Sequence, residues 1–192
     1  SSDYIWPWCY LCTVRVEKLQ AGWGSDVVFR QFPLHPETPE AGLSLEELFA
    51  GRNIDIPAAQ ARMTQLMAEE GLPYGERTMT YNSRLAQELA KWAETQPNGK
   101  QIHDALFHAY FADGVNLAKI DNLAAIAERL GLPATKAERV LAERQFSDAV
   151  DADWQRSREL GITGVPTFVV GNRGLVGAQP YEQLEALVAS AD

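Results

Sequence analysis

The sequence predicts an α/β protein whose two ends build one domain and whose middle is helical. Three observations predict this order. A helix followed by a strand fills the front, about a hundred residues then carry helix signals without a strand signal, and a strand, a turn, a second strand and a helix close the chain. We therefore place the first part of the α/β domain at 1–42, an all-helical lobe at 43–146 and the second part at 147–192.

The front of the chain predicts a helix that leads into a strand. Residues 9–20 carry apolar side chains on roughly one side, and the Gly22-Trp23-Gly24 break ends the helix. Residues 26–32 predict a strand because they are rich in β-branched and aromatic side chains, and Pro33 closes it. Only residues 1–5 precede the helix, which leaves room for a short opening strand.

Helix start signals recur through the middle of the chain. Ser44 with Glu47 and Thr135 with Glu138 have capping-box spacing, and Pro57 suits the first turn of a helix. Apolar stripes at helical spacing are Leu85, Leu89, Trp92 and Ala93, then Ile102, Leu106, Tyr110 and Phe111, then Leu123, Ile126, Ala127 and Leu130. We expect these helices to pack around a core of their own.

The end of the chain predicts the second half of the α/β domain. A helix over 146–160 is followed by a strand within 162–171, a short strand at 175–176 and a last helix over 180–190. Because this part returns to strands, we expect it to join the front of the chain in one sheet.

The composition predicts a soluble globular protein. A chain of 192 residues, 46% of them hydrophobic, is long enough to bury about 70% of its unfolded surface. With 17 basic and 26 acidic residues the formal charge is −9, which excludes a nucleic-acid partner because phosphate binding needs clustered cations. No apolar run reaches the roughly 18–20 residues of a membrane helix, and no secretory signal pattern is visible. We expect a cytoplasmic protein without a membrane partner.

Cys9 and Cys12 are the two cysteines of the chain and lie near the start of the first predicted helix. N–H groups at a helix start lower a thiol pKa, and residues three apart on a helix are neighbours, so this C-x-x-C pair predicts redox chemistry. The alternative is a pair of small buried residues. A metal site is excluded because zinc needs about four ligands. We expect His35, His103 and His108 at the surface.

Several segments resemble the DsbA-like thioredoxin-fold superfamily. They are Ser2-Asp3-x-x-Trp6-Pro7-Trp8-Cys9-Tyr10-Leu11, Phe32-Pro33-Leu34, Ala105-Leu106-Phe107-His108-Ala109-Tyr110-Phe111, Gly161-Ile162-Thr163-Gly164-Val165-Pro166-Thr167-Phe168 and Gly177-Ala178-Gln179-Pro180. The FrnE-like branch is the most similar, and its relatives include the 2-hydroxychromene-2-carboxylate isomerases and kappa-class glutathione transferases. The resemblance covers essentially the whole chain. It implies a thioredoxin fold with a large all-helical insertion and thiol–disulfide oxidoreductase activity.

The active-site motif of this family is altered in the present sequence. The family usually has C-P-x-C at the start of the first helix, with an attacking first and a resolving second cysteine. Here Trp6 stands at the first position, Cys9 at the second and Cys12 one turn further on. The nucleophile that the resemblance implies is therefore missing, and Cys9 stands at the position of the resolving thiol, which is typically more buried and less acidic. We expect any redox chemistry to use Cys9, with Cys12 resolving the mixed disulfide. Two alternatives stay open: a glutathione-dependent isomerase or transferase acting on an aromatic small molecule, and an inactive binding module closed by Trp6.

Val165-Pro166 matches the family's cis-proline. The resemblance implies that the N–H and C=O of Val165 pair with an extended peptide or with glutathione, a form of strand addition. The alternative is a plain turn before a strand. For partners, this implies peptide or protein thiols or a small aromatic substrate, with no required cofactor and glutathione as the one candidate.

Further substrate contacts are predicted on both sides of this site. Trp6, Trp8 and Tyr10 form either an apolar rim for an aromatic or peptide ligand or ordinary packing residues. The segment Gly177-Ala178-Gln179 precedes the last helix, where free N–H groups favour a carboxylate such as that of glutathione. A plain helix entry is the alternative for Gln179.

Overall fold

The computed structural model describes residues 1–191, so residue 192 of the predicted third segment lies outside the described residues. The helices are α1 (Pro7–Leu11), α2 (Thr13–Trp23), α3 (Leu45–Leu48), α4 (Ile56–Glu69), α5 (Arg84–Ala93), α6 (Ile102–Phe111), α7 (Ile120–Arg129), α8 (Ala134–Ala142), α9 (Ser147–Glu159) and α10 (Tyr181–Ala189), with a 3-10 helix at Gly99–Gln101. The strands are β1 (Leu43–Ser44), β2 (Met79–Thr80), β3 (Thr167–Val170) and β4 (Arg173–Val176). None of the described helices has both the length and the apolar character of a membrane span.

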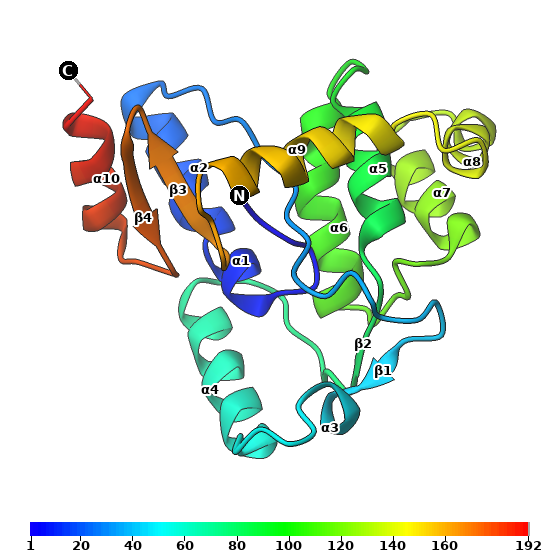
Figure 1. The fold of residues 1–192 in the computed structure, drawn as a ribbon, viewed down its shortest axis with the longest axis horizontal. Coiled ribbons are helices and arrows are strands. Elements are labelled where there is room, and N and C mark those ends of the chain that lie inside the picture. The colour runs from blue at the N-terminus through cyan, green and yellow to red at the C-terminus, as the bar shows by residue number, and fades with distance from the viewer. Residues whose placement is uncertain (192) are drawn as a thin grey trace.

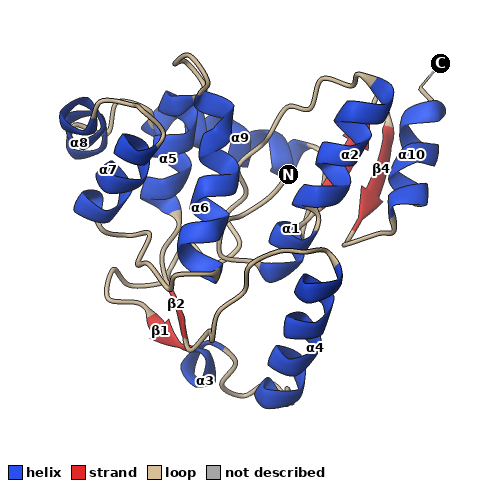
Figure 2. Cartoon of the chain, turned by 180° about the vertical axis from the view of Figure 1, so that it is seen from behind, coloured by secondary structure: helices blue, strands red, loops and turns tan. Residues whose placement is uncertain are grey.

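The two ends of the chain come together, as predicted (Figure 1). Ser2 forms a parallel bridge with Gln31, and the Thr167 N–H donates to the Ser1 carbonyl at 3.1 Å. β3 and β4 form an antiparallel hairpin whose register pairs Thr167 with Val176. Seen from behind, α2 and α10 lie beside β4 (Figure 2). The α/β fold class is confirmed, and the short N-terminal segment lies between the 30–32 segment and the hairpin.

The predicted strand over 26–32 is wrong as a regular strand. Only one bridge forms, closed by the Ser2 N–H to the Arg30 carbonyl and the Phe32 N–H to the Ser2 carbonyl, both 3.0 Å. Pairing stops there because the two groups that would continue this ladder are taken by side chains: the Phe32 carbonyl accepts from Gln87 at 2.9 Å, and the Leu34 N–H donates to the Asp3 carboxylate at 3.1 Å. The sheet is therefore narrower than the sequence predicts.

The predicted helix over 9–20 is two helices, α1 and α2, with Cys12 between them. Trp6 is the N-cap of α1 and Pro7 its first residue, so α1 begins two residues before Cys9. The Thr13 hydroxyl donates to the Tyr10 carbonyl at 2.8 Å, a local bond that competes with the regular helix ladder.

The middle of the chain is not entirely helical. β1 and β2 pair antiparallel, Leu43 with Thr80 and Ser44 with Met79, and so interrupt the predicted all-helical lobe. Two strands of two residues each are too short to show a period-two pattern, which is why the sequence hides them.

Cap signals in this region are partly confirmed. Ser44 and Glu47 form a full capping box, and Pro57 lies in the first turn of α4. The box predicted for Thr135 is wrong, because α8 begins at Ala134 with Pro133 as its N-cap.

Most of the buried hydrophobic residues form one cluster that spans the α/β part and the helical part, so the prediction of a separate core for the helical lobe is wrong. Tyr4 packs against Phe107 of α6 with ring centroids 5.1 Å apart, and Tyr10 stacks on Phe111 at 5.2 Å. Val165 belongs to the same cluster. The helices and the α/β part share their packing, and this shared core shapes the candidate site.

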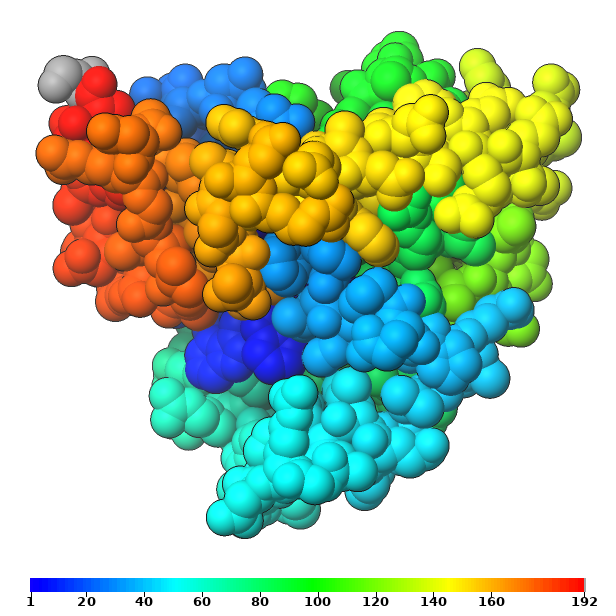
Figure 3. Space-filling model, in the orientation of Figure 1, coloured from blue at the N-terminus to red at the C-terminus, as the bar shows by residue number. Residues whose placement is uncertain are grey.

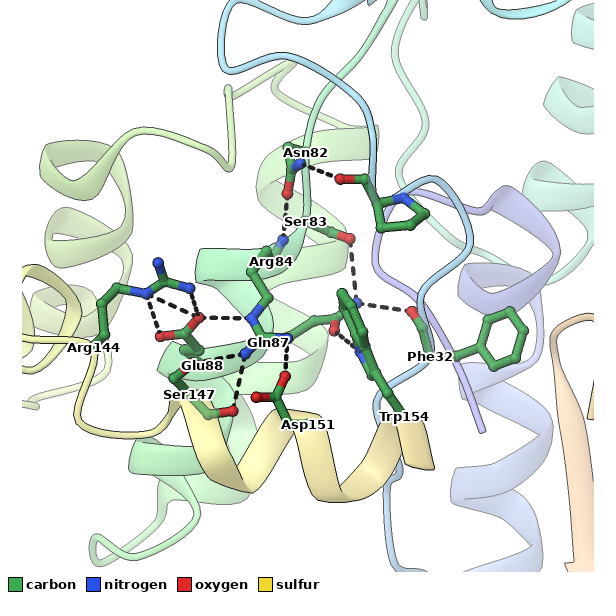
Figure 4. A network of polar contacts seen from close by, with 11 residues as sticks. Phe32, Asn82, Ser83, Arg84, Gln87, Glu88, Arg144, Ser147, Asp151 and Trp154 are labelled. Atoms are coloured by element: carbon green, nitrogen blue, oxygen red, sulfur yellow. Dashed lines mark hydrogen bonds and ion pairs between the residues drawn. The ribbon is translucent and has the colours of Figure 1, made fainter. Parts of the chain in front are cut away.

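A buried polar network joins α5 to α9 and to the loop before it (Figure 4). Glu88 is 1% exposed and accepts hydrogen bonds from Arg84 (2.8 Å) and Arg144 (2.9 Å). Beside it, the Trp154 indole of α9 donates to the Gln87 side chain at 2.8 Å. A buried carboxylate is tolerated here because two guanidinium groups compensate its charge.

We expect Glu88→Gln to lower the free energy of unfolding by about 2 kcal/mol, because it leaves two guanidinium groups without their buried anion. Asp151→Asn is the matched control: Asp151 also pairs with Arg84, at 2.8 Å, but is 61% exposed, so its loss costs at most about 0.5 kcal/mol. Urea unfolding of both variants measures the difference. Equal losses would show that burial of the pair is unimportant.

Candidate functional site

The candidate site lies where the N-terminal segment enters α1. Trp6 is the N-cap and its carbonyl accepts the Cys9 N–H at 3.0 Å, while the Trp6 and Trp8 side chains are partly exposed. In Figure 3 the N-terminal segment, in dark blue, reaches the surface between the orange C-terminal hairpin and the cyan α3–α4 segment. The position that the resemblance assigns to the reactive residue is therefore partly exposed and holds an indole.

Cys9 does not meet the requirements of a nucleophile. Its side chain is 3% exposed, and burial raises the thiol pKa from 9.0 to about 12. The Ser2 side chain and the Asp3 N–H oppose this rise without cancelling it. Because the thiolate is the reactive form, the predicted catalytic Cys9 is both covered and protonated at neutral pH.

The Cys12 thiol is equally inaccessible. It is 2% exposed, and burial raises its pKa to about 11 although the Arg15 charge lowers it. Arg15 pairs with Glu70 at 3.1 Å, and the Glu70 charge again favours the neutral thiol. Both cysteines are free thiols, and different polar groups surround them: Ser2 and Asp3 at Cys9, Arg15 and Glu70 at Cys12.

The Val165–Pro166 segment directly precedes β3 (Figure 1), and Val165 belongs to the same buried cluster as Cys9 of α1. The Val165–Pro166 peptide bond is cis. The Gly177 N–H donates to the Pro166 carbonyl at 2.8 Å, which joins the residue after β4 to the residue before β3. Within residues 1–191, neither the N–H nor the C=O of Val165 has a hydrogen-bond partner. These two backbone groups are therefore unpaired among the described residues, and Val165 as a whole is 8% exposed.

Tyr10 is not part of an exposed rim. Its ring is buried, stacks on Phe107 and Phe111 at 5.7 and 5.2 Å, and its hydroxyl donates to the Pro73 carbonyl at 2.7 Å. Shared packing with α6 places it in the core. The predicted aromatic rim reduces to Trp6 and Trp8.

The predicted carboxylate contact at Gln179 is not built as expected. The Gln179 N–H donates to the Gly177 carbonyl at 2.9 Å, its side chain donates to the Val176 carbonyl at 2.9 Å, and its own carbonyl accepts from Arg15 at 2.9 Å. The backbone and side-chain donors of Gln179 are thus both used within the chain. A cavity of about 380 Å³ lies beside it between α2 and α10, lined by residues that include Arg15 and Tyr181.

Asp3 positions the site, a role that sequence reasoning missed. It is fully buried, and its carboxylate accepts the Leu34 N–H at 3.1 Å and the Ile5 N–H at 3.5 Å. Burial raises its pKa from 3.8 to about 6, against the opposing effect of hydrogen bonds from Ser83 and Gln87 and from these two N–H groups. The one signal in the sequence is its place three residues before Trp6.

Arg77 is the second residue that the sequence does not reveal. Its Nη2 donates to the Ile5 carbonyl at 3.1 Å, and its Nε donates to the Tyr110 hydroxyl at 2.8 Å. The Tyr110 hydroxyl donates onward to the Met79 carbonyl at 2.6 Å. Arg77 lies in the connection between α4 and β2, where no pattern distinguishes it.

Two of the three histidines differ from the predicted surface residues. The His103 side chain is 14% exposed. Its Nδ1 lies 2.7 Å from the Tyr4 hydroxyl oxygen, and its Nε2 lies 3.1 Å from a Glu94 carboxylate oxygen. Burial also lowers the pKa of the partly buried His35, and only His108 is exposed. The helical spacing of His103 and His108 did not predict that His103 on α6 faces Tyr4.

These features agree with comparisons to known proteins. Residues 1–189 match the DSBA-like thioredoxin domain family. The chain belongs to this family. The predicted resemblance to DsbA-like proteins is therefore confirmed, whereas the FrnE-like branch stays a prediction.

Three solved structures of DsbA-like or related proteins resemble this chain. A probable DsbA oxidoreductase from Streptomyces coelicolor is 30% identical, with 99% of this chain and 87% of that chain covered and a TM-score of 0.90. A 2-hydroxychromene-2-carboxylate isomerase is 18% identical over 98% and 92%, with a TM-score of 0.77. The cytosolic disulfide reductase DsbM from Pseudomonas aeruginosa, solved with GSH, is 16% identical over 97% and 96%, with a TM-score of 0.65. The DsbA-like fold thus occurs in both oxidoreductases and isomerases.

The raised pKa of Asp3 predicts a pH dependence of stability. Between about pH 4 and pH 6 the folded protein holds a proton that the unfolded chain has released, so the free energy of unfolding falls as the pH rises. The full fall is roughly 3 kcal/mol. Asp3→Asn removes this slope, whereas the exposed Asp148→Asn keeps it. Urea unfolding at pH 4.5, 5.5 and 6.5 measures the slopes, and parallel slopes for Asp3→Asn and the unaltered protein would contradict the prediction.

Proposed function

We propose that this DsbA-like protein binds glutathione and acts as a glutathione-dependent isomerase or transferase on an aromatic small molecule. The ligand then supplies the thiol that the protein lacks. One observation carries the proposal: the partly exposed Trp6 stands at the position that the resemblance assigns to the family's reactive residue, while Cys9 and Cys12 are buried and protonated.

The surroundings of Trp6 support a bound thiol peptide. The free N–H and C=O of Val165 suit the backbone of a short peptide that adds as a strand. The partly exposed indoles of Trp6 and Trp8 offer apolar faces for an aromatic second substrate. An isomerase and a structure that contains GSH are both among the similar folds.

A cytoplasmic location is part of this proposal. Glutathione keeps cytosolic thiols reduced, and the two cysteines of this chain are free. A thiol ligand is abundant and reduced in that compartment.

Thiol–disulfide oxidoreductase activity through Cys9 is the second candidate. The 30% identical relative, a probable DsbA oxidoreductase, favours it. With a pKa of about 12, the thiolate fraction of Cys9 at pH 7 is on the order of 10⁻⁵, so this activity needs an opening of the core around α1. Cys12 then resolves the mixed disulfide by thiol exchange.

Glutathione binding tests the proposed function directly. We expect isothermal titration calorimetry to detect binding to the unaltered protein and, within about threefold, to the double variant Cys9→Ala, Cys12→Ala, because neither thiol faces the ligand. Circular dichroism controls the fold. Absence of binding to the unaltered protein overturns the proposal, and if an aromatic ligand alone binds, a binding module is what remains. Isomerisation of 2-hydroxychromene-2-carboxylate with added glutathione then tests turnover.

Trp6→Cys tests the altered motif by restoring C-P-W-C with Cys9 as its second thiol. We expect insulin reduction at least about tenfold above the unaltered protein, because a thiol at the helix N-cap is exposed and more acidic. Trp6→Ser controls for loss of the indole, and Cys9→Ala added to Trp6→Cys abolishes the gain. If the unaltered protein already reduces insulin and Cys9→Ala alone stops it, the second candidate is correct.

A further inference from the structure

Arg77 carries a positive charge that no described carboxylate compensates. Five arginines form ion pairs, and the others without a carboxylate within 4.0 Å are exposed except Arg77. Its guanidinium carbon lies 5.5 Å from the Tyr110 ring centre and 5.7 Å from that of Phe111. Partial burial against aromatic rings weakens hydration, so a cation placed there gains more from an anionic ligand than an exposed one.

The hydrogen bonds of Arg77 leave one edge of its guanidinium open. Nε and one N–H of Nη2 are used by Tyr110 and Ile5. No residue within 1–191 accepts a hydrogen bond from Nη1. The N–H groups of Nη1 are therefore without a partner in the described residues, and a guanidinium group offers such N–H groups to the oxygens of a carboxylate.

The hydrogen bonds of Arg77 hold its guanidinium next to the candidate site. The Ile5 carbonyl that accepts from Nη2 belongs to the residue directly before Trp6, and the Tyr110 hydroxyl holds Nε. Burial lowers the pKa of His35, and the Glu37 charge opposes this effect. Arg52 and Arg77 are close enough to His35 for their charges to lower its pKa further. In a protein of net charge −9, this is a local positive field beside the site.

We propose that Arg77 binds the carboxylate of the ligand at the Trp6 site and so selects carboxylate-bearing ligands. The identity of the ligand rests on the proposed function, in which the glycine carboxylate of glutathione is the partner. The same chemistry fits the carboxylate of an aromatic acid. Arg77 is then a specificity-determining residue that the helical lobe contributes to a site built by the N-terminal segment.

Calorimetry with paired probes tests this role. We expect Arg77→Met to raise the dissociation constant of glutathione about 10- to 100-fold, since it removes a charge-assisted bidentate contact. Arg77→Lys keeps the charge but lacks the planar guanidinium, so we expect its dissociation constant for glutathione to lie between those of the unaltered protein and Arg77→Met. Glutathione with its glycine carboxylate esterified binds the unaltered protein weakly and loses nothing further in Arg77→Met. Arg129→Met, an exposed change of the same charge, leaves binding within about twofold.

A second probe pair, benzoate and benzamide, separates this inference from the proposed function. Equal glutathione binding by the unaltered protein and Arg77→Met overturns the role of Arg77 and leaves the proposed function intact. If glutathione fails to bind but benzoate binds, benzamide does not, and Arg77→Met loses benzoate, the carboxylate site stands and the glutathione proposal falls. No binding of either acid rejects both. If Arg77→Met does not fold, the Arg77→Lys result and the ester comparison decide.

Discussion

The Asp3 carboxylate is the constraint on which the site depends. It accepts the N–H groups of Ile5 and Leu34, so it fixes two segments as they leave the narrow sheet, one toward α1 and one toward the following loop. Within residues 1–191 no cation pairs with it, and hydrogen bonds alone, including those from Ser83 and Gln87 at the start of α5, oppose its desolvation. A single buried acid therefore joins the α/β part, the helical part and the chain that positions Trp6.

The C-x-x-C pair illustrates how depth, rather than spacing, decides thiol chemistry. Cys9 follows the N-cap by three residues and already faces Ser2 and Asp3 in the interior, and Cys12 ends the short first helix. A shift of one helical turn moves a thiol from an exposed helix start into a core where the neutral form is favoured. The fold of the family is retained, while Trp6 occupies the position that the resemblance assigns to the family's reactive residue.

Two of the three helix-start signals in the sequence are confirmed, whereas most contacts between distant segments were not predictable from it. The Ser44–Glu47 capping box and the Pro57 helix start are confirmed because each depends on residues within one turn. The two-ended α/β order is confirmed as well. The burial of Tyr10 and the contact of Arg77 with Ile5, 72 residues apart, depend on how α6 and the α4–β2 connection dock, and no periodicity records that.

The shared core has a consequence for how this protein is able to diverge. Arg77 and Tyr110 come from the helical part, whereas Trp6 and Val165 come from the two arms of the α/β part, and one continuous core holds them together. The helical segment is thus no exchangeable module: grafting it from a relative alters ligand choice and folding stability in one step. A change in ligand binding therefore requires substitutions that are compatible with the packing of both the α/β part and the helical part.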